Sequence, residues 1–522
     1  MAKQIRPAGF LTRLEFSNTH YMGLQLPTDM FYVSVANKMI PVIRKSLKED
    51  SRVTDSVAKQ IALRLACYLE DLVAGTGVWA AFVRLCKEKY GCSVPFYSVN
   101  PGDFPEEEPT EGAISYLLWS ELNLLNPQTV LVPLTQRILD LARILFPLMI
   151  SAYETAPDTE MVVKVYEDQP MPVIYQIRNM CYWLISGSYL TGLHDPVRIM
   201  DAAGRFFSTS MAPKDGSAPD FSKIRYAVDS YLPFNVKIGP LGLLPQQWLA
   251  EMMVCRGVEE DSNYIEIVKE LRSIPYSFYL VKEVSPEKAV VDSLDGKELT
   301  LSPLTMPDGV FPEYVAADTV SYVSLVYFDK TWIINGVAVN SLKREVFENA
   351  RKEWDGVSED AKKKFDELVE KNNGSRIGVC SSIDEYQKIF GIDDDQLTDY
   401  QKRMKAELKN SKNIIYFINS GFHVEIIPDL GDCISIPGNE FYSSRGSKEL
   451  VMIFDKNIAS EAFRDYIVRN NLIPAARLKT SNSDVDGHEL LQKNLPFFID
   501  NIKEGNIDFV VDPLRSSLYW RE

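Results

Sequence analysis

The sequence predicts a multi-domain α+β protein, in which an N-terminal helical domain precedes a small β-barrel of the SH3 or OB kind and a C-terminal α+β domain. Three observations support this fold class. With 522 residues, the chain is long enough for about three to four domains of ordinary size. Its apolar residues recur with a helical period up to about residue 272, and then alternate as in strands up to about residue 342. A strongly charged helical segment follows, and strands and helices mix after it.

These changes of pattern divide the chain into four predicted segments. They are a mainly α-helical domain over residues 1–272, a five-stranded barrel over 273–342, a charged helical connector over 343–375 and an α+β domain over 376–522. No internal repeat indicates a solenoid instead.

Capping signals delimit helices in the first domain. Thr54 is a favoured N-cap residue type and precedes an apolar stripe, while Gly75, Gly77 and Gly91 are typical of helix ends. These signals predict helices over residues 55–74 and 78–90. Helical periodicity also covers residues 30–47, 112–125, 134–153, 172–186, 196–207, 245–256 and 262–272.

The predicted barrel consists of five short segments with strand periodicity: residues 276–284, 289–294, 299–301, 319–328 and 332–339. Asp295 and Gly296 follow the second segment, and this pair favours a two-residue type I′ turn in which both residues have positive φ. We expect the ring of Trp332, on the last strand, to pack inward. Strands this short and this close together favour a small closed barrel.

The C-terminal domain combines both periodicities. Strands are predicted over residues 413–419, 424–427, 433–436 and 450–454, and helices over 459–469 and 489–502. The strands form antiparallel hairpins in this prediction, which argues against a doubly wound parallel sheet.

Composition restricts the partners. The formal net charge is −16 and the pI is about 5.0, which argues against nucleic acid or an anionic membrane as the main partner. The most hydrophobic stretch, residues 129–153, is interrupted by Arg137, Asp140 and Arg143, which predicts a buried helix and no membrane span. Seven widely spaced cysteines include no CxxC pair, which indicates a reducing, cytoplasmic location. We therefore expect another protein as the partner.

No recognisable nucleotide, metal or nucleophile motif occurs, and the four histidines lie far apart. We therefore expect no cofactor and no metal, and we assign no catalytic residue. The adjacent carboxylates Glu70 and Asp71 lie close to Gly75 and Trp79, where a cleft with an aromatic wall would raise a carboxyl pKa. The alternative is that neighbouring helix residues point about 100° apart, so that at least one carboxylate is solvated.

Aromatic residues supply the other candidates for an interaction site. A recognition groove could be lined by Trp79, Phe82, Tyr90, Phe96, Tyr97 and Trp119. The alternative is that these residues form part of the core. If the ring of Trp332 is exposed, that residue becomes the candidate for contact with a partner or a nucleic-acid base.

Several local sequences carry a family resemblance: Leu26-Pro27-Thr28-Asp29, Tyr68-Leu69-Glu70-Asp71, Gly75-Thr76-Gly77-Val78-Trp79, Pro95-Phe96-Tyr97 and Leu117-Leu118-Trp119. In these the chain resembles a family of Bacteroidota proteins known only as domain of unknown function 3843. The likeness covers about residues 20–340. It implies a bacterial origin and a shared fold, but no functional residue, because the family has no assigned activity.

The leading hypothesis is a non-catalytic, cytoplasmic interaction or scaffold protein. One alternative is an enzyme whose carboxylate or hydroxyl chemistry leaves no linear motif, and another is a nucleic-acid-binding protein that uses the barrel. A pocket with convergent, perturbed carboxylates would favour the enzyme, whereas a broad exposed apolar patch would favour the interaction protein.

Overall fold

The chain forms two compact units. Unit 1 comprises Met1–Ile199, Leu232–Leu271 and Leu478–Asn506, and unit 2 comprises Met200–Tyr231, Arg272–Arg477 and Ile507–Glu522. The computed structural model describes residues 9–50, 53–97, 107–124, 133–157, 171–193, 196–210, 220–304, 315–397, 399–419, 424–443, 459–470, 472, 493–494, 496–497 and 500–501. The division into four segments stays a prediction.

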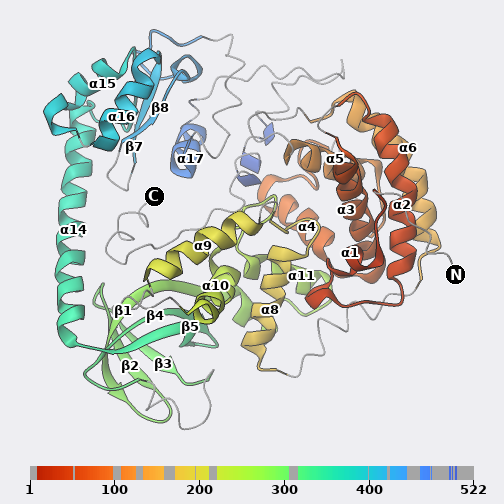
Figure 1. Ribbon diagram of the computed structural model, residues 1–522, viewed down its shortest axis with the longest axis horizontal. Helices are drawn as coiled ribbons and strands as arrows, with labels where there is room; N and C mark the ends of the chain where they lie inside the picture. The colour runs from red at the N-terminus through yellow and green to blue at the C-terminus, as the bar shows by residue number, and fades with distance from the viewer. Residues whose placement is uncertain are drawn as a thin grey trace. The chain divides into compact units, whose positions relative to one another are not determined.

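Unit 1 is built from helices (Figure 1). They are α1 (Arg13–Ser17), the 3₁₀ turn η1 (Tyr21–Gly23), α2 (Asp29–Ser46), α3 (Asp55–Ala74), α4 (Val78–Tyr90), α5 (Glu111–Leu124), α6 (Gln136–Glu154), α8 (Val173–Ser186), α11 (Pro245–Cys255) and α12 (Asn263–Glu270). Two more helices, α9 (Pro196–Ser210) and α10 (Phe221–Asn235), have residues in both units. The helices predicted from periodicity are confirmed.

The predicted caps of α3 and α4 are confirmed. The Thr54 side chain accepts a hydrogen bond from the Val57 backbone N–H, and Gly75 and Gly91 end their helices in the left-handed conformation. The apolar stripe of α3 is buried, and this helix packs against α2 and α5.

The helix α10 is absent from the sequence prediction. Two of its large apolar side chains, Phe221 and Tyr226, are 75% and 44% exposed, so its apolar residues do not mark the buried face. Pro233 also lies inside the helix, where proline usually indicates a helix end.

Unit 2 contains a five-stranded sheet, drawn in green in Figure 1. Its strands are β1 (Arg272–Val284), β2 (Ala289–Ser293), β3 (Glu298–Ser302), β4 (Val320–Phe328) and β5 (Thr331–Leu342), which agree with the five predicted segments. They pair in the order β1-β2-β3-β5-β4, and β4 pairs back to β1. Only the β3–β5 pairing is parallel among the described strands. Alternate residues of all five strands point to one apolar core.

The turn prediction for Asp295 and Gly296 is wrong. Gly296 has φ +81°, but Asp295 is not among the residues with positive φ. The loop instead spans three residues, because the Gly296 N–H donates to the Ser293 carbonyl and Ser293 and Lys297 pair across the loop. The two-residue turn with positive φ at both positions is the β4–β5 turn, at Asp329 (φ 45°) and Lys330 (φ 65°).

The second sheet of unit 2 has the antiparallel order β6-β7-β8, with β6 (Ile377–Cys380), β7 (Ile414–Ile418) and β8 (Val424–Ile427). The helices α15 (Ile383–Phe390), α16 (Asp399–Glu407) and α17 (Glu461–Arg469) accompany it. The long helix α14 (Arg344–Lys371) packs Phe347 and Ala350 against the first sheet, and Leu368 and Val369 against the core of the second.

The strand predicted over residues 433–436 is wrong. The chain forms a 3₁₀ turn at Gly431–Cys433, and the Asn439 side chain donates to the carbonyls of Gly431 and Ile434 at 2.7 Å each. A side chain therefore satisfies carbonyls that a strand would offer to its neighbour. The strand predicted over 450–454 lies outside the described residues, as does most of the helix predicted over 489–502.

The β4–β5 turn yields a stability prediction. Lys330 is exposed and holds a conformation that costs an L-residue energy, so Lys330→Gly should stabilise the chain by roughly 0.5–1 kcal/mol. Lys288→Gly is the matched control, because Lys288 is also exposed in a hairpin turn but has no positive φ. The control should destabilise the chain. Chemical unfolding measures both changes, and the same sign for the two variants would contradict the prediction.

Candidate functional site

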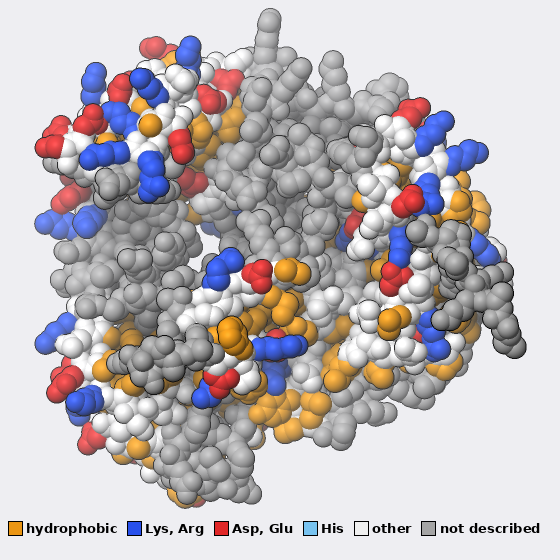
Figure 2. All heavy atoms as spheres, in the orientation of Figure 1, with side chains coloured by type: hydrophobic (Ala, Val, Ile, Leu, Met, Phe, Trp, Pro, Cys, Tyr) orange, Lys and Arg blue, Asp and Glu red, His pale blue; other side chains and the backbone are white. Residues whose placement is uncertain are grey.

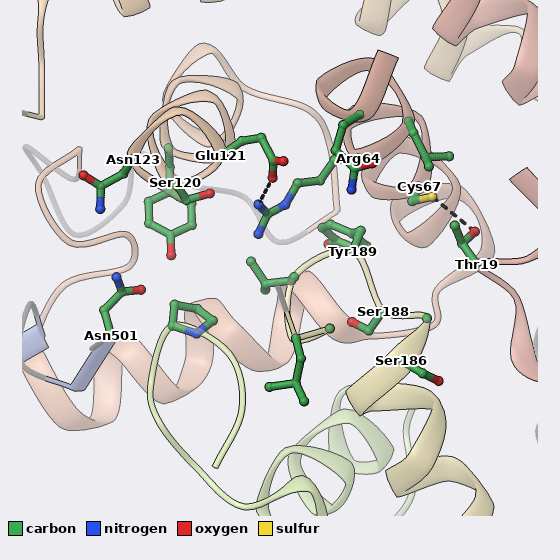
Figure 3. Close-up of a pocket in the computed structure, with 18 residues that line it drawn as sticks. Thr19, Arg64, Cys67, Ser120, Glu121, Asn123, Ser186, Ser188, Tyr189 and Asn501 are labelled. Atoms are coloured by element: carbon green, nitrogen blue, oxygen red, sulfur yellow. Dashed lines mark hydrogen bonds and ion pairs between the residues drawn. The ribbon is translucent and has the colours of Figure 1, made fainter. Parts of the chain in front are cut away.

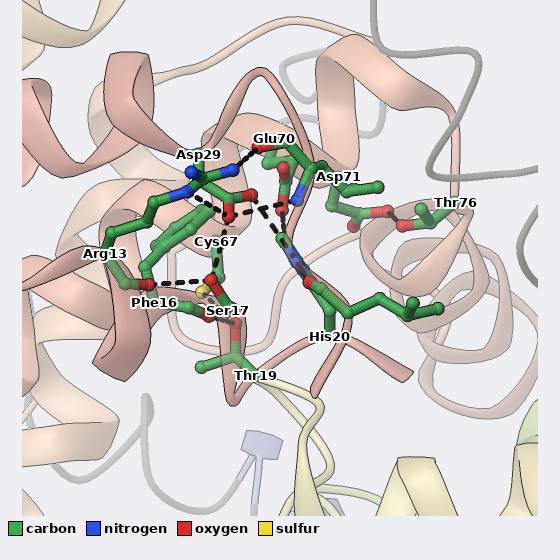
Figure 4. Close-up of polar contacts among 12 residues, drawn as sticks. Arg13, Phe16, Ser17, Thr19, His20, Asp29, Cys67, Glu70, Asp71 and Thr76 are labelled. Carbon is green, nitrogen blue, oxygen red and sulfur yellow. Dashed lines mark hydrogen bonds and ion pairs between the residues drawn. The ribbon is translucent and has the colours of Figure 1, made fainter. Parts of the chain in front are cut away.

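A cluster of buried polar side chains lies where three parts of unit 1 meet: the last turn of α3, the bend into α4 and the segment between α1 and α2 (Figure 4). We call His20, Asp29, Glu70 and Asp71 the polar centre. Each of the four is no more than 6% exposed. The expectation that either Glu70 or Asp71 is solvated is therefore wrong.

Asp71 accepts hydrogen bonds from four donors. Its Oδ1 accepts from the Thr76 hydroxyl and from the Val78 N–H at 3.1 Å, and its Oδ2 accepts from the Trp79 N–H at 2.7 Å and the Tyr189 hydroxyl at 2.8 Å. Because the N-cap Gly77 has no side chain, Asp71 satisfies the first N–H groups of α4 in its place.

Gly77 allows the sharp bend that brings these groups together. Helices α3 and α4 meet at 88°. Gly77 has φ +87°, and a Cβ at this position would lie 3.0 Å from the Met252 carbonyl of α11. A side chain at this position would therefore be strained in conformation and crowded against the Met252 carbonyl.

Glu70 points away from Asp71, toward His20 (Figure 4). Its Oε2 lies 2.8 Å from Nε2 of His20, while Nδ1 of His20 lies 2.9 Å from the Leu24 carbonyl. A carbonyl only accepts, so Nδ1 carries a proton. A second proton is then shared between Nε2 and Glu70. The other carboxylate oxygen, Oε1, is buried and has no hydrogen-bond donor among the described residues.

Asp29 lies behind the imidazole and connects it to α1. Its Oδ2 accepts from Nε of Arg13 at 3.2 Å, from the Ser17 hydroxyl at 2.8 Å and from the Leu26 N–H at 3.1 Å. Its Oδ1 lies 3.7 Å from Nδ1 of His20. The segment between α1 and α2 is thus fixed by one buried carboxylate.

The environment changes the proton affinities of this centre. Burial raises the pKa of Glu70, although the hydrogen bond from His20 opposes the rise. Burial acts to lower the pKa of His20, but the hydrogen bond and charge of Glu70 outweigh it, and the pKa is raised. Because the pKa values of Glu70 and His20 are both raised, the pair holds its shared proton more tightly than the two separate groups would. Burial also raises the pKa of Asp71, against the effect of its donors.

Two adjoining cavities lie beside the polar centre. The smaller, of about 30 Å³, is lined by His20, Glu70 and Asp71. The larger, of about 180 Å³, lies between α3, α5 and the segment after α8 (Figure 3). The two share the lining residues Thr19, Cys67, Gly187 and Tyr189. Glu70 lines the smaller cavity, whose volume is about that of one water molecule, and does not line the larger one.

The wall of the larger cavity contains a buried ion pair. The guanidinium of Arg64 on α3 contacts the Glu121 carboxylate on α5, and the two side chains are 13% and 5% exposed. Figure 3 shows the Arg64 side chain directed across the cavity wall toward Glu121, with Asn123 and Asn501 at one end and Thr19 and Cys67 at the other. Burial raises the pKa of the Cys67 thiol to about 12, so this group is not a thiolate near neutral pH.

The aromatic candidates from the sequence are core residues. Trp79, Phe82, Phe96 and Tyr97 are at most 6% exposed. The rings of Phe82, Tyr90, Phe96 and Tyr116 surround Phe497, whose side chain is completely buried. A groove between these rings is therefore filled by a residue of the same chain.

Two polar contacts anchor the segment that carries Phe497. The Phe96 N–H donates to Oδ1 of Asn494 at 3.1 Å, and Nζ of Lys89 lies 2.6 Å from Oδ2 of Asp500. Asn501, one residue further on, lines the larger cavity. This segment is thus part of the cavity wall as well as of the core.

Trp332 is half-buried, and its ring packs against the core of the first sheet in unit 2. One side of the ring contacts Tyr327, with a centroid distance of 5.2 Å, and the guanidinium of Arg272 lies 5.4 Å from its centroid. The expected inward packing is met in part. Trp332 does not belong to the polar centre, which is in unit 1.

Other features of the described part of the chain bear on chemistry. No group of three or more His, Cys, Asp or Glu side chains in it is arranged to hold a metal ion. None of the seven cysteines forms a disulfide, and five are buried, among them Cys67, Cys86 and Cys181. Within the same residues, no single helix is long and apolar enough to span a membrane, and only the bent pair α3 and α4 passes that test jointly.

Sequence reasoning found Glu70 and Asp71 but missed His20, Arg64, Glu121 and Tyr189. The contact between His20 and Glu70 joins residues 50 positions apart, and the contact between Tyr189 and Asp71 joins residues 118 positions apart. No local pattern signals such pairs. The only signal was the adjacency of two acids to a glycine-rich helix end.

Comparison with known proteins places the polar centre in a family. The model of the family described as "Protein of unknown function (DUF3843)" matches residues 14–274, which are half of the chain. The matched segment contains the whole polar centre. No curated protein and no solved structure is significantly similar to the chain.

The raised pKa of His20 predicts a pH-dependent stability. A group whose pKa is higher in the folded state stabilises the fold fully below its unfolded pKa, here about 6.5, and loses this contribution as the pH rises through the folded value. The melting temperature should therefore fall from pH 6.5 upward more steeply in the wild type than in His20→Gln. Parallel curves for the two proteins would contradict the assignment.

The hydrogen bonds of Asp71 predict a large loss of stability in Asp71→Ala. The variant leaves two backbone N–H groups and two hydroxyls buried without their acceptor, which should cost roughly 3–5 kcal/mol. Glu111→Ala is the control, because Glu111 is likewise an acid near a helix N-terminus but is half exposed, and its loss should cost less than about 0.5 kcal/mol. Chemical unfolding compares the two, and equal costs would show that Asp71 is not a structural acceptor.

Proposed function

Because the chain belongs to this family of proteins of unknown function, we propose a function from the chemistry of its polar centre: unit 1 is an enzyme that uses Glu70 as a general acid and base toward a small substrate. One observation carries the proposal. Glu70 is a buried carboxylate beside a cavity, one of its oxygens has no donor among the described residues, and a histidine holds the other.

The two neighbouring carboxylates have different roles in this proposal. Asp71 has four donors, so protonation would cost it those bonds, and its role is structural. Glu70 has one partner, and burial raises its pKa toward the range in which a carboxyl both releases and takes up a proton. A substrate in the larger cavity exchanges its proton with Glu70 through one water molecule in the smaller cavity.

His20 acts as a positioning residue. Its Nδ1–H donates to the Leu24 carbonyl, which fixes the ring so that Nε2 meets Glu70. While the shared proton lies on Nε2, the imidazolium compensates the charge of the Glu70 carboxylate. Asp29 stabilises the same imidazolium from the other side of the ring, at 3.7 Å.

Protein interaction, the leading hypothesis from the sequence, is the second candidate. Leu14, Met22, Leu24 and Met30 are 60%, 77%, 41% and 45% exposed and lie together in the sequence. Met22 also holds a left-handed conformation, with φ 54°, in the segment that the polar centre fixes. Exposed apolar residues on a fixed segment favour contact with a partner.

The structure adds little to the nucleic-acid alternative. Its candidate Trp332 packs against its own sheet and faces Arg272. Over the region of α15 and α16, Figure 2 shows Lys and Arg interspersed with Asp and Glu, without a continuous basic surface. Such a mixture gives no strong field for phosphates.

The finer expectations about architecture and location are also proposals. The cyclic pairing of five short strands supports a small barrel of the SH3 or OB kind in unit 2. The absence of a disulfide among the seven cysteines supports a cytoplasmic location. The family resemblance supports an origin in Bacteroidota.

Glu70→Gln tests the enzymatic role. Glutamine has the shape of glutamate and can still hydrogen-bond to Nε2 of His20, but it cannot exchange a proton. We expect the wild-type protein to convert at least one component of a bacterial metabolite extract, followed by mass spectrometry, and the variant to be slower by about 10²-fold or more.

The melting temperature of the variant shows whether it is folded. If the folded variant converts the same components at the wild-type rate, or if the wild type converts none, the enzymatic proposal fails. Asp140→Asn, a change at an exposed acid on α6, serves as the control for charge and should leave the conversion unchanged.

A further inference from the structure

The larger cavity also indicates which ligand it fits. We propose that it binds a neutral, polyhydroxylated molecule of the sugar or polyol class. The inference deepens the proposed function, because this ligand would be the substrate that lies next to Glu70. The inference depends on the charges of the residues that line the cavity and on whether their polar groups donate or accept hydrogen bonds.

The charges of the wall compensate one another. Arg64 and Glu121 form a buried ion pair, so the wall offers neither an unpaired cation nor an unpaired anion from these two residues. A ligand with a net charge would leave that charge buried without a counter-charge, which is costly. A neutral ligand avoids this cost.

Several hydroxyl groups of the lining residues can act toward a ligand only as acceptors. Three of them donate their only proton to the protein: Ser120 to the Leu117 carbonyl at 3.0 Å, Ser186 to the Tyr182 carbonyl at 2.9 Å and Tyr189 to Asp71 at 2.8 Å. Their remaining lone pairs can only accept. They therefore suit a ligand that donates, and they disfavour carboxylate or phosphate oxygens, which are acceptors only.

Other polar groups of the wall can donate. The Arg64 guanidinium and the side-chain amides of Gln60 and Asn501 carry N–H groups. An ammonium group on a ligand could not accept from them. A hydroxyl group both donates and accepts, so an array of hydroxyl groups matches both kinds of wall group at once.

The size of the cavity agrees with this class. Its volume of about 180 Å³ corresponds to roughly six water molecules at about 30 Å³ each. A polyol replaces such a group of waters with hydroxyl groups that make the same kinds of hydrogen bond.

Calorimetry of the full-length protein with neutral sugars and their charged counterparts tests the inference. The neutral set is D-glucose, D-galactose, D-mannose and myo-inositol, and the charged counterparts of glucose are D-glucuronate and D-glucosamine, each at up to millimolar concentration. We expect at least one neutral compound to bind, and at least about tenfold more tightly than the charged compounds. Binding of the charged compounds alone, or of no neutral compound, would overturn the inference.

A matched pair of variants tests the physical reason. Glu121→Gln keeps the shape of the wall but leaves Arg64 without its carboxylate, so the preference should shift by about tenfold or more toward glucuronate. If this variant does not fold, Ser186→Ala provides the test, because Ser186 is exposed and its loss removes only one acceptor. It should weaken binding of the neutral ligand several-fold at an unchanged melting temperature, and unchanged binding would count against the inference.

The inference and the enzymatic proposal can fail separately. Glu70→Gln should still bind the neutral ligand, because Glu70 does not line the larger cavity. If the sugar binds but neither protein converts it, the ligand class stands and the enzymatic role fails. If Glu70→Gln abolishes conversion of a charged metabolite, the enzymatic role stands and the ligand class fails.

Discussion

The hydrogen bonds that Asp71 accepts are the constraint on which the polar centre depends. They hold the last turn of α3 against the first turn of α4 across a bend of 88°. Because successive residues of a helix point in different directions, fixing Asp71 also fixes the direction of Glu70, which then meets His20. The bond from Tyr189 joins the segment after α8 to the same carboxylate and so sets one wall of both cavities. Asp71, which receives four hydrogen bonds, therefore positions Glu70, one of whose carboxylate oxygens receives none from the described residues.

The contrast between Glu70 and Asp71 distinguishes a carboxylate with a structural role from one that can take part in chemistry. Both side chains are buried to the same degree, so burial alone cannot distinguish them. They differ in the number of donors that each receives: four for Asp71, and one for Glu70. A carboxylate that is fully hydrogen-bonded stabilises a fold, whereas one with a free oxygen retains a capacity for bonding that a ligand can use.

The sequence predicted those features that depend on neighbouring residues. The cap at Thr54, the glycine ends of α3 and α4 and the five strands of unit 2 follow from local patterns, and the structure contains them. Predictions failed where a distant or exposed group decided the outcome: Asn439 displaced a strand, and exposed aromatic residues hid α10. For the site, the sequence supplied both carboxylates of α3, but their partners come from other elements, and only the folded chain places them together.

The burial of Phe497 has a consequence for the order in which the molecule matures during synthesis. Its ring completes a cluster formed by Phe82, Tyr90, Phe96 and Tyr116, and nearby contacts join residues 398 and 410 positions apart. The ribosome adds the four partner rings hundreds of residues before it adds Phe497. Most of unit 2 is therefore synthesised while the aromatic cluster of unit 1 still lacks its central ring. Until then the N-terminal half exposes apolar surface of the kind that makes folding intermediates prone to aggregation, and that surface is covered when the late segment arrives.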